Sequence, residues 1–240
     1  MLINSTAIVL SKIKYKDYDL IVRCYTQHRG VVSYLVKGGL KNTKSNALKS
    51  VYFQPLSQLQ IIENYKANQS LHFFKEVRTA CIYKTLHTNI YKSAIVLFLS
   101  EVLNSALREE EQDTDLYHFL ETALKYLDDE TEFSNFHLLF LVKLTRYLGF
   151  QPEKPSKNES YFNLLNGYFE DHPTDIYSIS GKNFRLLKQL LGTNFDTLKD
   201  VKLTAKERQD FLNMLLSYFE LHLGNFKKPK SLKILNDVFH

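Results

Sequence analysis

The chain has 240 residues, a length that suits one large domain or two of modest size. Hydrophobic residues make up 44% and charged residues 24%, ordinary globular values that exclude a fibre or a wholly disordered chain. The longest unbroken apolar stretch, residues 94–99, is far shorter than the about 20 residues of a membrane-spanning helix, so we expect no membrane partner. The two cysteines, Cys24 and Cys81, suggest neither a disulfide framework nor a metal site and fit a cytoplasmic protein.

Positive charge is concentrated in the first third of the chain. The whole chain has a net charge of +5, but residues 1–80 hold twelve Lys and Arg against four Asp and Glu, a net of +8. The remaining 160 residues carry a net of −3. This uneven distribution predicts that the N-terminal part binds an anionic partner.

Short runs of alternating apolar and polar residues, which are typical of strands, fill residues 5–38. Turn-prone residues near 15–19 and at 28–30 divide this segment into three strands. Two more strands are predicted at about 56–64 and 70–77. Five short antiparallel strands, with one longer insertion between the third and fourth, predict a small Greek-key barrel of the oligonucleotide-binding (OB) type.

From about Thr79 the apolar period changes to 3.6 and predicts a long, largely buried helix that passes through Ile82, Leu86 and Ile90. We therefore expect an α+β fold in two domains. Residues 1–79 are predicted to form a five-stranded OB-type β-barrel that binds nucleic acid, and residues 80–240 a mainly α-helical domain.

Capping signals place more helices in this second domain. One is expected to begin at Asp113 or Thr114 and to end near Leu127, and the next to end at Leu148 before Gly149.

Residues 150–181 break every period and are predicted to be an irregular insertion, with a short hairpin or helical turn at 161–169. Helices are expected again at 182–191 and at 204–223, the latter started by the capping box TAKE. A basic segment then leads into a short terminal helix.

Residue patterns for enzyme chemistry are missing from the sequence. The stretch KGGLKNTKS lacks the spacing of a phosphate-binding loop, and the histidines form no pair spaced for a metal. Cys24 lies in an alternating strand, and nothing in the sequence places a base beside it. We therefore expect no catalytic residue, no cofactor and no metal ion, and we expect the protein not to be an enzyme.

Cationic side chains of the predicted barrel are candidates for contacts with DNA phosphates, and nearby rings could stack on bases. The candidate DNA-binding residues are Lys12, Lys14, Arg23, Arg29, Lys37, Lys41, Lys44 and Lys49. The candidate rings are Tyr15, Tyr18, Tyr25, Tyr34 and Tyr52. Alternatively, the lysines are solvated faces and each tyrosine packs in a core or at a strand edge. For a single tyrosine we favour packing; for the lysines as a set we favour binding. Gly38 and Gly39 should let the third strand end in a sharp exit, and residues 38–50 should form a cationic loop.

One stretch of the predicted barrel resembles a known family. The sequence RGVVSYLVKGGLKNTKSN, followed by YFQPLSQLQI, is similar to the signature of the RecO family of recombinational DNA-repair proteins. The matching positions are Gly30, Lys37, Gly38, Lys41, Lys44, Gln54 and Pro55. Landmarks at 148–150 and 223–235 extend the resemblance over nearly the whole chain.

The resemblance implies an N-terminal OB barrel, a helical C-terminal domain and a cytoplasmic, nucleoid-associated protein. It implies binding of single- and double-stranded DNA and annealing of complementary strands. It also implies a RecR-type partner, the acidic C-terminal tail of the single-stranded-DNA-binding protein, and indirect help to a RecA-type recombinase, which is loaded onto coated single strands.

The sequence departs from the family at one place. Many relatives carry a four-cysteine zinc motif after the L-G-F segment, whereas residues 151–181 contain no cysteine, so we predict no zinc. The rival hypothesis is a non-enzymatic protein–protein adaptor whose basic barrel binds an acidic protein partner. Charge reversal at Lys41, Lys44 and Lys49 would separate the two, since the adaptor predicts unchanged DNA affinity.

Overall fold

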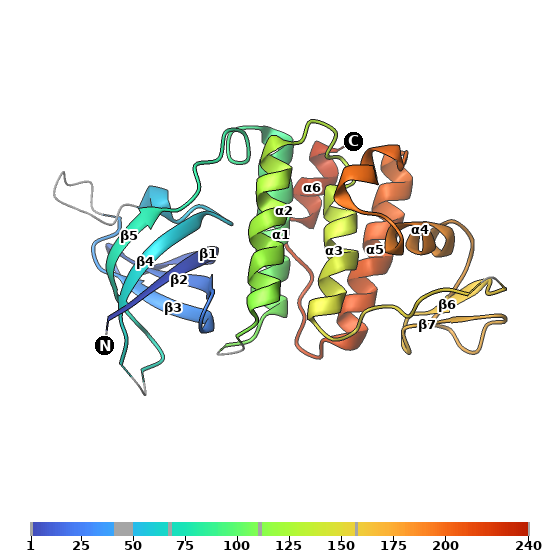
Figure 1. The fold of residues 1–240 in the computed structure, drawn as a ribbon, viewed down its shortest axis with the longest axis horizontal. Helices are drawn as coiled ribbons and strands as arrows, with labels where there is room; N and C mark the ends of the chain where they lie inside the picture. The colour runs from blue at the N-terminus through green and yellow to red at the C-terminus, as the bar shows by residue number, and fades with distance from the viewer. Residues whose placement is uncertain (1, 41–49, 67–68, 110–111, 157, 240) are drawn as a thin grey trace. The chain divides into compact units, whose positions relative to one another are not determined.

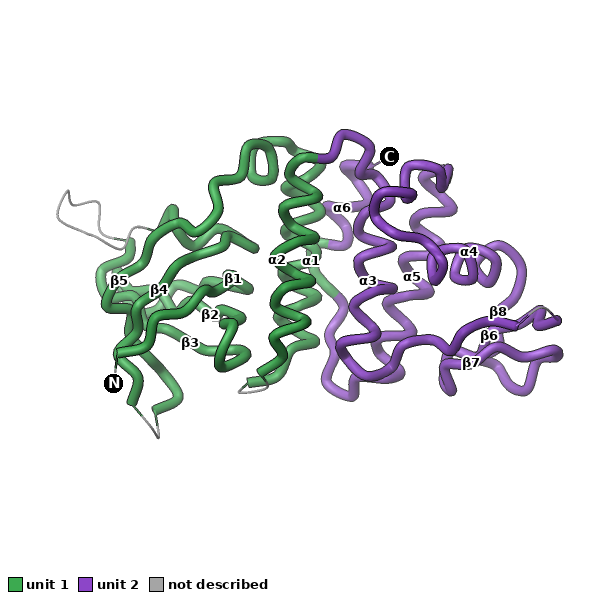
Figure 2. Tube along the Cα trace, in the orientation of Figure 1, with its two compact units in different colours: residues 1–129, 229–231 green, residues 130–228, 232–240 purple. Residues whose placement is uncertain are grey.

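The computed structural model describes residues 2–40, 50–66, 69–109, 112–156 and 158–239 (Figure 1). Lys41, Lys44 and Lys49 lie outside the described residues. The chain forms two compact units (Figure 2). The first comprises residues 1–129 with 229–231, and the second residues 130–228 with 232–240.

A five-stranded antiparallel sheet begins the first unit. Its strands are β1 (Leu2–Tyr15), β2 (Asp19–Thr26), β3 (Gly30–Val36), β4 (Gln58–Asn64) and β5 (Phe74–Thr79). Their order in the sheet is β3-β2-β1-β4-β5, so the long first strand is central and pairs with both β2 and β4. This arrangement confirms the predicted α+β class and the OB-type sheet. A short 3-10 helix, η1 (Ser50–Tyr52), precedes β4.

The edge strands of the sheet approach each other without pairing along their lengths. In the part of the chain that the structure describes, an isolated bridge joins Tyr34 of β3 to His72, two residues before β5. Its two hydrogen bonds run from the amide of Leu35 to the carbonyl of His72 and from the amide of His72 to the carbonyl of Ser33, both 2.9 Å. The sheet is therefore strongly curved but does not close into a complete barrel.

The inner face of the sheet holds an apolar core. Val22, Cys24 and Tyr34 are buried there, and the rings of Phe53 and Phe74 lie above them. The centroids of Tyr34 and Phe74 are 4.0 Å apart, and those of Phe53 and Phe74 are 5.7 Å apart. The stacked rings of Tyr34, Phe53 and Phe74 therefore fill the narrow interior of the curved sheet.

Two helices follow the sheet in the first unit, α1 (Ile90–Ala106) and α2 (Thr114–Asp129). The predicted start of α1 near Thr79 is wrong, because the first turns implied by Ile82 and Leu86 do not form. Ile82 is 86% exposed, and the helix begins only where the side chain of Asn89 accepts hydrogen bonds from the amides of Tyr91 and Lys92. The predicted Asp113 cap of α2 is confirmed, since its carboxylate accepts the amide of Leu116 at 2.9 Å.

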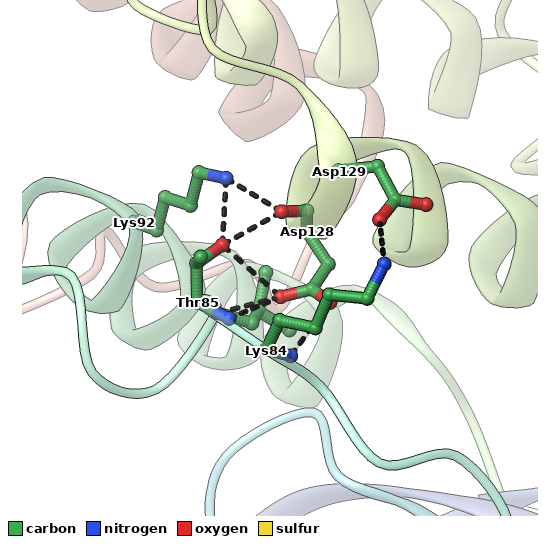
Figure 3. A network of polar contacts seen from close by, with 6 residues as sticks. Lys84, Thr85, Lys92, Asp128 and Asp129 are labelled. Atoms are coloured by element: carbon green, nitrogen blue, oxygen red, sulfur yellow. Dashed lines mark hydrogen bonds and ion pairs between the residues drawn. The ribbon is translucent and has the colours of Figure 1, made fainter.

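A polar network holds the segment before α1 against the end of α2 (Figure 3). The buried carboxylate of Asp128 accepts three backbone amides, those of Lys84, Thr85 and Leu86, at 2.7 to 2.8 Å. The buried ammonium of Lys92 donates to the carbonyl of Asp128 at 2.7 Å and to the hydroxyl of Thr85 at 2.8 Å. Burial alone would raise the pKa of Asp128, but the backbone hydrogen bonds outweigh it and lower that pKa.

The second unit is mainly helical. Its helices are α3 (Phe136–Tyr147), α4 (Gly181–Leu191), α5 (Ala205–His222) and α6 (Leu232–Val238), with a 3-10 turn, η2 (Phe195–Asp200), before α5. The predicted capping box at the start of α5 is confirmed: Thr204 accepts the amide of Glu207, and the Glu207 carboxylate accepts the amide of Thr204. Gly149 follows α3 with a φ of +81°, which confirms its expected place after the helix.

The segment predicted as irregular contains a small three-stranded sheet made of β6 (Tyr161–Asn163), β7 (Tyr168–Glu170) and β8 (Ser178–Ile179). The hairpin expected at 161–169 is confirmed by the pairing of β6 with β7, whereas β8 was not predicted. Polar side chains hold this sheet together. The buried carboxylate of Glu170 accepts hydrogen bonds from the hydroxyls of Thr174 and Ser178.

Candidate nucleic-acid interface

The outer face of β1, β2 and β3 has two halves that differ in what covers them. Strand register places Ser11, Arg23 and Ser33 in one row across the three strands, and Ile13, Ile21 and Leu35 in a neighbouring row on the same face. The hydroxyl of Ser11 donates to the side chain of Asn104 on α1 at 3.1 Å. The first row is therefore the part of the face that α1 covers.

Arg23 fastens the sheet to the end of α1. Its guanidinium donates to the carbonyl of Asn104 at 2.8 Å and to the side-chain oxygen of the same residue at 3.0 Å. A longer contact of 3.5 Å reaches the carbonyl of Leu107. Because these carbonyls end a helix, they attract a cation, and Arg23 is largely occupied by them.

Beyond this row the face is exposed and partly apolar. We name this exposed area the platform and define it by Ile13, Tyr15, Ile21, Leu35, Lys37 and Phe73. Ile13 is 59% exposed, Tyr15 37% and Phe73 38%, while Ile21 and Leu35 are half-buried. The inward neighbour of Phe73 is Phe74, which lies in the core, so the pleat turns Phe73 outward.

Two ammonium groups lie over the exposed rings of the platform. The Nζ atom of Lys37 is 5.5 Å from the ring centroid of Phe73, and that of Lys16 is 5.4 Å from the ring centroid of Tyr15. These are cation–π distances. The platform therefore combines exposed aromatic area with positive charge.

Lys12 and Lys14 project from the opposite face of the same ribbon, because they alternate with Ile13 along β1. Both are exposed. The ammonium of Lys12 donates to the carbonyl of Ser50 at 3.2 Å, and partial burial lowers the pKa of Lys12. The candidate lysines of the described residues thus lie on two faces of one end of the sheet.

The segment with the remaining candidate lysines is flanked by residues that adjoin this same end of the sheet. On one side, the amide of Leu40 donates to the carbonyl of Tyr18 at 3.0 Å, and the amide of Gly38 donates to the carboxylate of Asp19 at 2.8 Å. On the other side, Ser50 accepts the hydrogen bond from Lys12. The β1–β2 hairpin therefore contacts both flanks of residues 41–49.

The two glycines of this exit have separate roles. Gly38 has a φ of +66°, a conformation that favours glycine. Gly39 packs so closely that a Cβ atom there would lie 3.0 Å from a methyl group of Val36 and 3.1 Å from one of Leu20. The predicted sharp exit from the third strand is confirmed.

Arg29 lies beside His72, at the isolated bridge between the two edges of the sheet. Its guanidinium donates two hydrogen bonds of 3.0 Å to the carboxylate of Glu63, whose side chain is 1% exposed. The guanidinium also lies 4.3 Å from the ring centroid of Tyr65, and it contacts the imidazole of His72 at 3.2 Å. A paired cation over a buried carboxylate is needed by the fold, because Glu63 would otherwise be an unpaired buried charge.

The candidate tyrosines divide by burial. Tyr25 and Tyr34 are fully buried, Tyr52 is half-buried against the core, and Tyr15 and Tyr18 are exposed. The hydroxyl of Tyr25 donates to the carbonyl of Asp113, and its ring stacks on that of Tyr117. Sequence reasoning missed Lys16 and Phe73. Only the adjacent pair Phe73-Phe74 offered a signal, since successive residues of a strand face opposite sides.

Groups for covalent or metal chemistry are not assembled in the described residues. Burial raises the pKa of the Cys24 thiol, which therefore stays protonated. Among residues 2–40, 50–66, 69–109, 112–156 and 158–239, no three His, Cys, Asp or Glu side chains are grouped as metal ligands would be. The helices of this same part of the chain include none that is long and apolar enough to span a bilayer.

The second unit has a small pocket between α3, α5 and α6. It is lined by His137, Arg208, Leu212, Leu235 and Phe239, among others. Burial, together with the charge of Arg208, lowers the pKa of His137 to about 3, so this imidazole is neutral near pH 7. The pocket is therefore lined by apolar side chains, by the neutral polar side chains of Gln209 and Asn236, and by the charged Arg208 guanidinium. This guanidinium also donates to the carbonyl of Ser134 at 3.1 Å.

Comparisons with known proteins match the chain in two segments, which meet near the end of the N-terminal sheet. Residues 1–83 match the family model described as Recombination protein O N terminal, and residues 87–233 match the one described as Recombination protein O C terminal. The chain is 47% identical over 239 residues to the DNA repair protein RecO of Christiangramia forsetii and 42% identical to that of Flavobacterium johnsoniae. Both alignments cover 100% of each chain. This chain therefore belongs to the RecO family of DNA repair proteins.

Proposed function

We propose that this protein is a non-enzymatic recombination mediator that binds single- and double-stranded DNA at the exposed end of its N-terminal sheet. Membership of the RecO family carries the proposal. The exposed lysines of the β1–β2 hairpin and the β3 exit support it, because they gather positive charge beside exposed rings. The domain division at residue 79 is part of this proposal, with the OB-type sheet as the DNA-binding part.

Phosphate contacts are assigned to the exposed lysines of this end. These are Lys12, Lys14, Lys16 and Lys37. Lys41, Lys44 and Lys49, which lie outside the described residues, are proposed as further contacts because they lie in the same basic stretch of the sequence. Arg23 and Arg29 are left out, because their guanidinium groups already bind helix carbonyls and a buried carboxylate. Each neutralised phosphate releases condensed counterions, so affinity should fall steeply as salt rises.

Annealing follows from the same charge. Two complementary strands repel each other until cations screen their phosphates. Lysines on two faces of one hairpin could hold one strand while a second strand approaches from the other side. The protein would thereby lower the electrostatic barrier to pairing without any covalent step.

The second unit is proposed to contact proteins. Its pocket, with apolar walls and the Arg208 guanidinium, suits the acidic C-terminal tail of a single-stranded-DNA-binding protein. A RecR-type partner would act with the protein, and a RecA-type recombinase would then load onto the coated strand. These steps would take place in the cytoplasm, at the nucleoid.

An annealing assay tests the proposal. Complementary strands coated with their single-strand-binding protein should anneal faster with the wild-type chain. Reversing the charge of Lys41, Lys44 and Lys49 to Glu should abolish this gain and weaken DNA binding. The matched control reverses Lys182, Lys202 and Lys206, which are exposed lysines of the second unit, and should leave DNA binding unchanged. Unchanged DNA affinity in the first variant would favour a protein–protein adaptor instead.

A further inference from the structure

The platform exposes rings on a sheet that buries most of its other aromatic side chains. Phe53, Phe74, Tyr25 and Tyr34 lie in cores, whereas Phe73 and Tyr15 keep more than a third of their surface in contact with solvent. Half-buried Ile21 and Leu35 lie in the adjoining row of the same face. Two exposed rings on one sheet face offer flat apolar surface to a ligand that can stack on them.

Each exposed ring carries a cation at short range. Lys37 lies over the ring of Phe73, and Lys16 over the ring of Tyr15. Register places Tyr15 opposite Asp19, and the amide of Gly38, next to Lys37, donates to the Asp19 carboxylate. Tyr15 and the residue after Lys37 therefore both adjoin Asp19, the first residue of β2. A nucleotide offers the complementary pair of groups, a flat base for the ring and a phosphate for the ammonium.

We infer that the platform stacks unpaired DNA bases on Phe73 and Tyr15, an inference that rests on the proposed DNA-binding function. A duplex hides the faces of its bases inside the stack, whereas a single strand can present them. The lysines therefore bind both forms of DNA, and the two rings bind single strands selectively. The inference therefore predicts tighter binding to unpaired regions than to duplex DNA.

Fluorescence can report the stacking directly, because the chain has no tryptophan. Phe73→Trp and Tyr15→Trp each create a single reporter on the platform. Tyr168→Trp, at a tyrosine of β7 that is 40% exposed, is the control. An oligothymidylate strand should quench the two platform reporters and leave the control unchanged, and a duplex of equal length should quench none of them.

Anisotropy of labelled DNA, measured on the same samples, separates two failures. Bound single strands without quenching at either platform position would overturn the inference and leave the proposed function standing. An absence of binding to either form of DNA would overturn the proposed function and the inference together. Quenching of the control to the same extent would also overturn the inference, because the signal would not be local.

Affinity ratios provide the second test. Phe73→Leu, which keeps apolar bulk and removes the ring, should weaken binding of the single strand by about tenfold and binding of the duplex by less than about twofold. Phe73→Tyr keeps a ring and should restore the single-strand affinity. Equal losses for both forms of DNA, or no loss for either, would contradict a stacking role.

Discussion

The two halves of the outer face of β1–β3 share one strand register but differ in what their side chains contact. In the covered half, Arg23 and Ser11 bind the end of α1, and Tyr25 binds the start of α2. In the exposed half, Ile13, Tyr15 and Phe73 remain in contact with solvent, with lysines beside them. The comparison teaches that two basic residues of one sheet face differ in their surroundings: the carbonyls at the end of α1 bind Arg23, whereas Lys37 stays exposed. Charge in the sequence alone does not distinguish the two halves.

The largest expected effect comes from breaking the network that holds the covering helices. Asp128→Ala leaves three backbone amides without their carboxylate, and we expect it to lower the free energy of unfolding by about 3–4 kcal/mol. Asp129→Ala is the matched control. Its carboxylate makes only an exposed ion pair with Lys84, so the loss should stay below about 1 kcal/mol. Urea denaturation measures both, and equal losses would refute the role assigned to Asp128.

A smaller effect is expected from the covered half itself. Arg23→Met keeps the aliphatic stem but leaves helix carbonyls without a donor, so the free energy of unfolding should fall by about 2 kcal/mol. DNA affinity, measured where the variant is fully folded, should not change. A large loss of affinity at unchanged stability would return Arg23 to the set of phosphate contacts.

The second unit should respond to pH through His137. Its folded pKa of about 3 lies below the ordinary value of 6.5, so the unfolded chain binds the proton more readily. The contribution to stability is therefore complete above pH 6.5 and is lost as the pH falls toward 3. Between pH 6.5 and pH 5 the loss should be between about 1 and 2 kcal/mol.

His137→Gln, which has no titrating side chain, is the comparison for that pH series. Denaturation across this pH range should give a flatter dependence for the variant than for the wild type. Parallel curves would show that His137 does not titrate with the shifted pKa.

The smallest stability effect is expected in the exposed half. Lys37→Met should change the free energy of unfolding by less than about 0.5 kcal/mol, because the side chain is exposed. It should still weaken DNA binding several-fold at low salt, since one phosphate contact is lost. Lys37→Met is therefore expected to lower DNA affinity and to keep stability nearly unchanged. Arg23→Met is expected to lower stability and to keep DNA affinity unchanged. If both variants lost affinity equally, the distinction between the two halves would fail.

Much of the fold could be predicted from periodicity. All five strands of the sheet, the capping box at Thr204 and the hairpin at 161–169 follow from local patterns that the structure keeps. The start of α1 could not be predicted this way. The carboxylate of Asp128 binds the amides of residues 84–86, which precede the helix. A local sequence pattern cannot indicate a partner more than forty positions away.

The site was predictable only in part. Lys12, Lys14 and Lys37 are exposed, as the charge count suggests, but Arg23 and Arg29 carry the same charge and are bound within the fold. Their partners, Asn104 and Glu63, are distant in sequence, so composition could not reveal them. Phe73 was not predicted as a site residue, yet it is exposed. The alternation of successive side chains places the ring of Phe74 in the core and that of Phe73 on the platform.

The salt dependence of DNA affinity tests the central claim most directly. The measurement compares the wild type with a variant in which Lys12, Lys14 and Lys37 are all replaced by Gln. If these lysines neutralise phosphates, the slope of the logarithm of the association constant against the logarithm of the salt concentration should become shallower by about 2–3. An unchanged slope would contradict the assignment of this end of the sheet to DNA.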